Sequence, residues 1–205
     1  MPKWGWAEGT NRYRNLDTGR FVSAAQVRGW GAEAIDAGGL ATNGFAEMVV
    51  DGRLNVRDWT LLLRDEIKDE YIQQYILGRG GLERMTQADW GSIGGSLREQ
   101  YTYLSRFSRQ IATGELTVGQ IQHRSRMYLN SAREAYSRAQ ARVAREAELT
   151  EVRWVVQFEA EHCKSCLAFE ALGWQKIADD PYHGATPGSG ATECLTACRC
   201  HLEFR

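Results

Sequence analysis

In the middle of the chain, hydrophobic residues recur every three to four positions with charged residues between them, a pattern typical of amphipathic helices. Three capping residues start the predicted long helices: Asn55, Thr86 and Thr117. The third helix continues to about Ala147 if it is unbroken, and a shorter helix over residues 44–50 precedes all three. Since short glycine turns usually join antiparallel neighbours, residues 43–150 are expected to form an antiparallel long-helix hairpin or bundle.

The first 42 residues carry no sustained helical or strand period, and their tryptophans are scattered among glycines and charged residues. Within them, two short extended segments flank an Asp-Thr-Gly turn, which predicts a hairpin over residues 13–23. We therefore expect residues 1–42 to form an extended N-terminal arm. Such an arm packs either on its own helices or across a neighbouring subunit, and the sequence leaves both options open.

Beyond residue 150 the pattern changes to β-branched and aromatic residues, which predicts a strand over residues 152–160. Residues 177–191 hold the later prolines and several glycines and are expected to form a loop. The alternating residues 201–204 could pair antiparallel with the strand that contains Trp154. Without a metal ion, this last part has too few hydrophobic core residues to fold alone.

All five cysteines of the chain lie in this last part. They are Cys163, Cys166, Cys194, Cys198 and Cys200. A pair separated by two residues can hold one tetrahedral ion from a single turn, and a second cluster then closes the coordination shell. Four thiolates leave no open position for water, so the pattern favours one structural zinc ion per chain, bound by four of the five. The predicted fold is mainly α, with an extended arm and a small C-terminal β-containing zinc module in residues 151–205.

Other interpretations of the cysteines stay open. They could be buried free thiols or form a disulfide, a bound zinc ion could be catalytic, or one cysteine could be a nucleophile with His162 or His183 as base. A nuclease of the HNH type also combines paired cysteines with a histidine base, and residues 179–183 contain the residue types that it needs. Those residues lie in the predicted loop, where a turn is the ordinary explanation.

The charge balance weakens a role in nucleic-acid binding. The 205 residues include 25 Lys+Arg and 26 Asp+Glu, whereas a general nucleic-acid binder usually has a basic excess. Arginines of the third predicted helix alternate with glutamates on several faces, which favours a solvated face or an acidic partner over DNA. No apolar run approaches the roughly twenty residues that span a bilayer, and the start does not resemble a signal peptide. We therefore expect a soluble protein made in a cytoplasm, where thiolates on a metal are favoured over disulfides.

Several motifs occur together near the C-terminus: His162-Cys163-x-x-Cys166, Gly173-Trp174, Pro187-Gly188-x-Gly190 and Cys194-x-x-x-Cys198-Arg199-Cys200-His201-Leu202. This combination resembles the tail of tailed-phage minor head proteins, a group that includes the Mu F-like head morphogenesis proteins. Those tails usually place His-Pro just before a Cys-Arg-Cys segment, and here Cys194 stands near that place and would replace the histidine as ligand. A weaker resemblance to phage virion proteins covers residues 13–23, 88–91, 97–104 and 111–116.

The resemblance implies a structural virion protein without catalytic activity, a minor head component associated with capsid or portal that contributes to head assembly or to the head–neck junction. Its partners would be capsid, portal or neck subunits, contacted in multiple copies within a symmetric assembly. Its location would be the virion, after synthesis in the host cytoplasm. The alternative function is a zinc-dependent nucleic-acid-binding module or an HNH-like nuclease.

Overall fold

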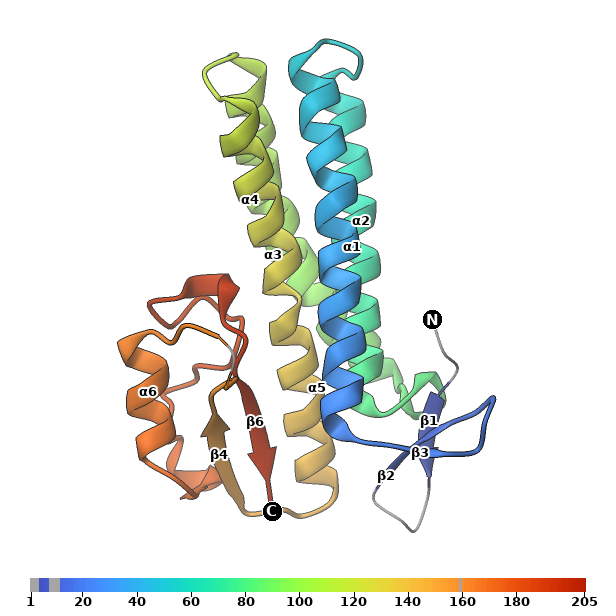
Figure 1. Cartoon of the computed structure of the whole chain (residues 1–205), viewed down its shortest axis with the longest axis vertical. Helices are drawn as coiled ribbons and strands as arrows, with labels where there is room; N and C mark the ends of the chain where they lie inside the picture. Colours follow the sequence, from blue (N-terminus) through green and yellow to red (C-terminus); the bar gives the residue numbers. More distant parts are fainter. Residues whose placement is uncertain (1–3, 8–11, 159) are drawn as a thin grey trace.

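The computed structural model describes residues 4–7, 12–158 and 160–205, with side chains from residue 14 onward. The side chains of Trp4 and Trp6, which belong to the predicted aromatic arm, lie outside this described part. Helices dominate, and small antiparallel sheets lie near the two ends of the chain (Figure 1). The predicted fold class is confirmed to this extent, as a mainly helical protein with a few small strands and a C-terminal cysteine cluster.

The helices are α1 (Ala24–Val50), α2 (Val56–Arg79), α3 (Gln87–Ala112), α4 (Val118–Ser131), α5 (Arg133–Glu146) and α6 (Lys164–Ala171), with the 3-10 turns η1 (Leu82–Arg84), η2 (Ile177–Asp179) and η3 (Leu195–Ala197). The strands are β1 (Trp4–Ala7), β2 (Arg12–Asn15), β3 (Phe21–Val22), β4 (Glu151–Val155), β5 (Gln175–Lys176) and β6 (His201–Phe204). The three predicted caps are confirmed, because the side chains of Asn55, Thr86 and Thr117 each accept a hydrogen bond from the backbone three residues on.

The extended arm predicted for residues 1–42 is wrong from residue 24 onward, because α1 begins at Ala24 and also absorbs the short helix expected over residues 44–50. A capping box starts the helix: Ser23 accepts from the Gln26 backbone, and the Gln26 side chain accepts from Ser23. Its buried face includes Gly31, Gly39 and Ala46, whose small side chains hide the helical period in the sequence. Close packing against the other helices overrides their weak helix propensity.

The third predicted helix is not continuous, because α4 and α5 meet at Ala132. Just before the break, the Ser131 hydroxyl donates to the carbonyl of Tyr128 at 2.6 Å and lies 2.9 Å from the Tyr71 hydroxyl. A serine that bonds back onto the preceding turn competes with the backbone hydrogen bonds of a helix and often bends it. Directly after the break, Gly188 of the C-terminal part packs against Arg133 and Glu134 at the start of α5.

At the N-terminal end, the hairpin predicted over residues 13–23 is confirmed. Strands β2 and β3 pair antiparallel, with Tyr13 opposite Val22, and Gly19 takes a positive φ of 69° in the turn between them. Strand β1 pairs antiparallel with the other edge of β2, so the arm folds into a three-stranded sheet. In Figure 1 this sheet lies at one end of α1, next to the start of that helix.

One continuous hydrophobic core joins α1 to α5. At its centre Trp59 of α2 meets Phe107 of α3 edge-on, with ring centroids 5.3 Å apart, and Phe107 stacks on Tyr128 of α4 at 6.1 Å. Helix α2 packs directly on α5 at Gly78, where an added Cβ would collide with the Tyr136 carbonyl oxygen and lie 2.7 Å from the Cβ of Ala139.

Substituting Gly78 with alanine should therefore destabilise the helices by about 1–3 kcal/mol, because backbone rather than a movable side chain occupies the space. Gly94 of α3 provides the control, since an added Cβ there meets nothing within 4 Å. The Gly94→Ala change should stabilise the protein by up to about 1 kcal/mol through helix propensity. Urea denaturation of both variants measures the difference, and equal effects would contradict the close α2–α5 contact.

Glu70 of α2 is a buried carboxyl in this core, and the Gln74 side chain donates to it at 2.7 Å. Burial raises its pKa from 4.5 to about 7, although Gln74 and the charge of Arg133 counteract part of the shift. The folded protein thus holds this proton more tightly than the unfolded chain does. The resulting stabilisation is complete below pH 4.5 and is lost as the pH rises to about 7.

The Glu70→Gln variant keeps the acceptor for Gln74 but cannot ionise. Its advantage in unfolding free energy over the unsubstituted protein should grow by about 3 kcal/mol between pH 4.5 and 8. Denaturation of both proteins at a series of pH values measures this difference. Subtracting one unfolding free energy from the other cancels the contribution of all other titrating groups. The Glu83→Gln variant, which removes an exposed carboxylate, serves as the control for the substitution itself. An advantage of Glu70→Gln that stays constant across this pH range would show that the Glu70 carboxyl is hydrated in the folded protein.

The C-terminal part, here called the cysteine module (residues 151–205), contains the second small sheet, in the order β5-β4-β6. The predicted antiparallel pairing is confirmed, with Trp154 of β4 opposite Leu202 of β6. The strand ends at Val155 rather than extending to residue 160, and residue 159 lies outside the described part. In Figure 1 the module lies beside α5. Among the described helices, none has a stretch apolar and long enough to cross a membrane.

Candidate metal centre

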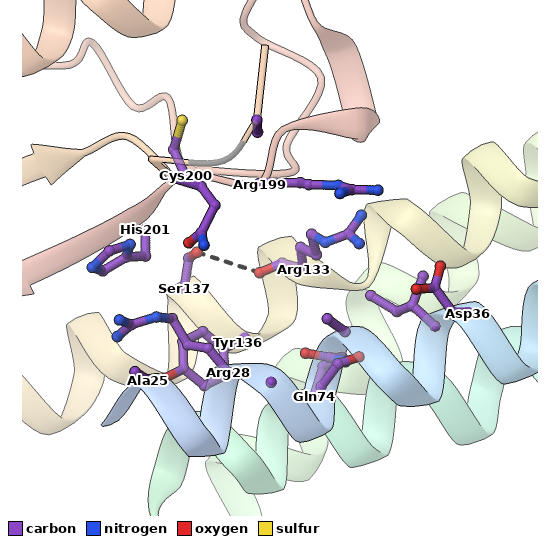
Figure 2. Close-up of a pocket in the computed structure, with 16 residues that line it drawn as sticks. Ala25, Arg28, Asp36, Gln74, Arg133, Tyr136, Ser137, Arg199, Cys200 and His201 are labelled. Atoms are coloured by element: carbon purple, nitrogen blue, oxygen red, sulfur yellow. Dashed lines mark hydrogen bonds between the residues drawn. The ribbon is translucent and has the colours of Figure 1, made fainter. Parts of the chain in front are cut away.

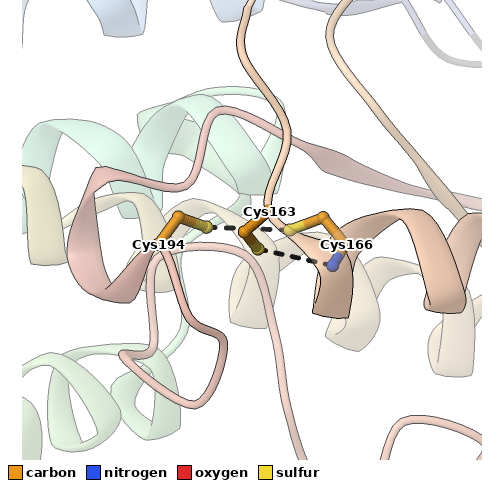
Figure 3. A group of neighbouring side chains, drawn as sticks. All are labelled: Cys163, Cys166 and Cys194. Carbon is orange, nitrogen blue, oxygen red and sulfur yellow. Dashed lines mark hydrogen bonds between the residues drawn. The ribbon is translucent and has the colours of Figure 1, made fainter.

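The first cysteine pair is positioned by the start of α6. Cys163 is the N-cap of this helix, and its Sγ accepts a hydrogen bond from the Cys166 backbone N–H at 3.5 Å (Figure 3). The sulfur thus takes the place of the oxygen that serine or aspartate usually provides at a helix start. The partial positive charge of a helix N-terminus favours a thiolate at this place.

The remaining cysteines come from the loop before β6. Cys194 precedes η3, Cys198 follows it, and Cys200 directly precedes β6. The Sγ atom of Cys166 lies 3.7 Å from that of Cys194 and 3.6 Å from that of Cys198. All five predicted cysteines are therefore brought together, and all five are free thiols rather than disulfides.

The sulfur atoms form two overlapping groups, each with its Sγ atoms within 4.8 Å of one another. Cys163, Cys166 and Cys194 make one group; Cys166, Cys198 and Cys200 make the other. In a tetrahedral shell with Zn–S bonds of about 2.3 Å, neighbouring sulfurs lie about 3.8 Å apart. The observed separations of 3.6 and 3.7 Å fit such an edge, so the cluster could bind a metal ion, with Cys166 at its centre.

The thiols differ in how readily they ionise. Burial alone raises the pKa of Cys163, but the Cys166 backbone N–H and the adjacent thiols outweigh burial and lower it to about 7. Burial raises the pKa of Cys194 to about 11. Burial and the neighbouring Cys198 raise the pKa of Cys166, while interaction with Cys200 and burial raise that of Cys198. A divalent cation would reverse these penalties, since it stabilises every thiolate that it touches.

The cysteine module has only a small core of its own. Its buried residues are Val152, Trp154, Cys166, Tyr182, Ala185, Cys198 and Leu202. Trp154 contacts Phe169 and Tyr182, with ring centroids 5.0 and 5.4 Å apart, and two of the metal-binding candidates complete the cluster. A core of this size offsets only part of the entropy of ordering the module, and a metal ion bound by the cysteines could supply further stability.

Contacts with the helices also hold the module. Gly188, with a φ of 85°, approaches α5 so closely that an added Cβ would lie 2.8 Å from both the Arg133 Cβ and the Glu134 nitrogen. The Ser137 hydroxyl of α5 lies 3.5 Å from the Pro187 carbonyl oxygen. The Pro-Gly loop predicted from the sequence thus helps to dock the module on the helices, together with β6 against α5 and η3 against α4.

The two histidines considered in the alternative interpretations belong to neither sulfur group. His183 is exposed in a turn, where its backbone N–H bonds to the Asp180 carbonyl and Gly184 bonds to the Asp180 side chain. His162 lies half-buried beside Cys163. Within the described residues, both candidate metal groups consist of cysteine alone.

The arginines of α4 and α5 mostly have partners within the chain. Arg124 lies over the Phe107 ring at 4.0 Å, Arg126 pairs with Asp36 at 2.9 Å, and Arg138 pairs with Glu134. Arg142 approaches Asp89 at 3.3 Å. These arginines thus have partners within the chain, whereas the sequence favoured a solvated face or an acidic partner for them.

Sequence reasoning missed one side chain that supports the cluster. The Thr192 hydroxyl lies 3.2 Å from the Sγ of Cys194, and Thr192 is buried. A hydroxyl donor next to a metal-bound sulfur helps to orient that ligand. The signal in the sequence is a threonine two residues before a cysteine, which is too common to stand out.

Comparison with known proteins adds no relative: no protein-family model, no curated protein and no solved structure matches this chain.

Proposed function

We propose that the cysteine module holds one structural zinc ion through four of its five cysteines. The observation that carries this proposal is the position of the Cys166 sulfur, 3.6 and 3.7 Å from the sulfurs of Cys198 and Cys194. Zinc bound by four thiolates has no open position for water, so its role is to join the start of α6 to the loop before β6. Its binding free energy would contribute directly to the folding of the module.

We further propose that the chain is a structural virion protein of a tailed phage, a minor head component at the capsid or portal. The combination of cysteine, Gly-Trp and Pro-Gly motifs near the C-terminus supports this, as does the mainly helical body with one continuous hydrophobic core. Large hydrophobic side chains are exposed on the surface, with Leu16 at 54% on the hairpin turn and Leu40 at 73% on α1. Such side chains suit contacts with neighbouring subunits.

Mass spectrometry of the purified protein under native and denaturing conditions, with zinc quantified, tests the first proposal. One zinc ion per chain under native conditions and none after denaturation is the expected result. A metal-free chain with disulfides after purification in reducing buffer and zinc-containing medium would refute it.

Quantitative proteomics of purified phage particles tests the second proposal. The protein should be present in a fixed copy number per particle and should remain bound after gradient purification. Its absence from particles, together with metal-dependent nicking of DNA that is lost in His183→Ala, would favour the nuclease instead.

A further inference from the structure

A pocket of about 330 Å³ lies between the helices and the cysteine module. Helix α1 forms its floor with the small residues Ala25, Gly29 and Ala32, and α5 and the loop before β6 form its walls (Figure 2). The small side chains on α1 leave this space open: an added Cβ at Gly29 would meet nothing within 4 Å. The small residues on this face of α1 thus create the pocket.

The lining of the pocket is strongly cationic. Arg28 of α1, Arg133 of α5 and Arg199 of the loop all contribute to it. Among the described residues, none of the three forms an ion pair with a carboxylate. Asp36 is the acidic residue of the lining, and its carboxylate is already paired with Arg126 at 2.9 Å. The pocket lining therefore has three arginines and one carboxylate, which gives it a positive excess.

The arginines and His201 gather at two ends of the pocket. Figure 2 shows the side chains of Arg133 and Arg199 running next to each other at one end, and those of Arg28 and His201 at the other. Two guanidinium groups held side by side without a carboxylate between them are arranged to share an anion.

His201 adds a second, independent observation. Its side chain is 8% exposed and neither ring nitrogen has a hydrogen-bond partner among the described residues, although Nε2 lies 3.5 Å from the Glu203 Oε1. A buried polar atom without a partner is costly and usually marks a place where water or a ligand completes the hydrogen bonds. Ser137 and Gln157 provide further polar groups in the same lining.

We propose that this pocket binds a small ligand with a diphosphate group, one phosphate between Arg133 and Arg199 and the other beside Arg28 and His201. A carboxylate offers two oxygens in one plane, whereas a diphosphate offers oxygens in several directions and negative charge at two points. Three arginines from three separate segments match the second kind of ligand. The site is separate from the sulfur cluster, and it goes beyond the proposed structural function.

Isothermal titration calorimetry of the full-length, zinc-loaded protein with pyrophosphate tests this inference at fixed ionic strength. The unsubstituted protein should bind pyrophosphate, and Arg28→Gln and Arg199→Gln should each weaken binding by about tenfold or more. The double variant should show no binding. Arg106→Gln, which removes an exposed arginine of α3 outside the pocket, should bind as the unsubstituted protein does.

Parallel titrations identify the source of the ligand. Inorganic phosphate should bind at least tenfold more weakly than pyrophosphate, because it reaches only one end of the pocket. A nucleoside diphosphate that binds more tightly than pyrophosphate would assign the group to a nucleotide, and weaker binding would assign it to free diphosphate. Absence of pyrophosphate binding at millimolar concentration, equal affinity for phosphate, or equal weakening by Arg106→Gln would overturn the proposal. Equal zinc content in all variants establishes that the module is intact.

Discussion

Replacing Cys166 with serine is expected to abolish zinc binding and to unfold the cysteine module, while α1–α4 stay helical. Cys166 is buried and belongs to both sulfur groups. A set of four ligands without Cys166 would require the other cysteines to move. Structural zinc contributes roughly 10–16 kcal/mol to comparable modules. Loss of one central thiolate should therefore remove several kcal/mol and leave a core too small to persist.

Zinc content, far-ultraviolet circular dichroism and hydrogen exchange of β4 and β6 together measure this effect. The neighbouring Ser165→Ala variant is the control, because Ser165 contacts Glu193 and does not belong to either sulfur group. Cys200→Ser should have a smaller effect, since Cys200 belongs to one group only. A chelator should destabilise the unsubstituted protein and leave Cys166→Ser unchanged. Full zinc occupancy in Cys166→Ser would refute the central position of this residue.

Replacing Asp89 with alanine should lower the unfolding free energy by about 3–5 kcal/mol. Asp89 is fully buried at the start of α3 and accepts from the Thr86 backbone and hydroxyl, each at 2.7 Å, and from the Tyr75 hydroxyl at 3.0 Å. Its carboxylate also lies 3.3 Å from the guanidinium of Arg79, which is 3% exposed. The substitution thus removes a helix cap and leaves a buried positive charge whose remaining carboxylate partner, among the described residues, is Glu146.

Asp58→Ala is a matched control, because Asp58 holds the same position in α2 but is exposed. Its loss should cost only about 0.3–1 kcal/mol. For a protein of this size, the melting temperature of Asp89→Ala should fall by roughly 6–20 °C. A melting temperature within 2 °C of that of Asp58→Ala would show that water replaces the carboxylate.

The effect of Asp89 also depends on pH. Burial opposes its ionisation, but the hydrogen bonds from Thr86 and Tyr75 and the charge of Arg79 outweigh burial and hold its pKa below the usual 3.8. Its stabilisation is therefore complete above pH 3.8 and is lost as the pH falls below that value. The difference between the unsubstituted protein and Asp89→Ala should shrink correspondingly in acid.

Local signals in the sequence predicted much of the fold, because each depends on a few adjacent residues. The caps at Asn55, Thr86 and Thr117, the turn at Gly19 and the alternation in β6 are all of this kind. Helix α1 was missed up to residue 43 because its glycines have low helix propensity and are tolerated only through contacts distant in sequence, such as that of Gly31 with Gln74. The break at Ala132 depends equally on a distant partner, Tyr71.

At the candidate metal centre, the identity of the ligands was predictable because cysteines are rare and their spacing is informative. The way in which the thiols divide into two groups around Cys166 was not, because it depends on where the loop before β6 crosses the start of α6. The cationic pocket was equally invisible, since its arginines lie on three segments that only the docking of the module on α5 brings together.

The pairing of β4 with β6 has a consequence for the order of folding. Arg153 and Glu203 face each other across these strands although they lie 50 residues apart in the sequence, whereas each long helix forms from neighbouring residues. Closing a loop of that length costs entropy before any contact compensates for it, so the sheet has to form after the helices. Thiolates that gather early on a zinc ion would tether both ends of most of this loop. The ion would then speed the formation of the β4–β6 sheet and also stabilise the folded module.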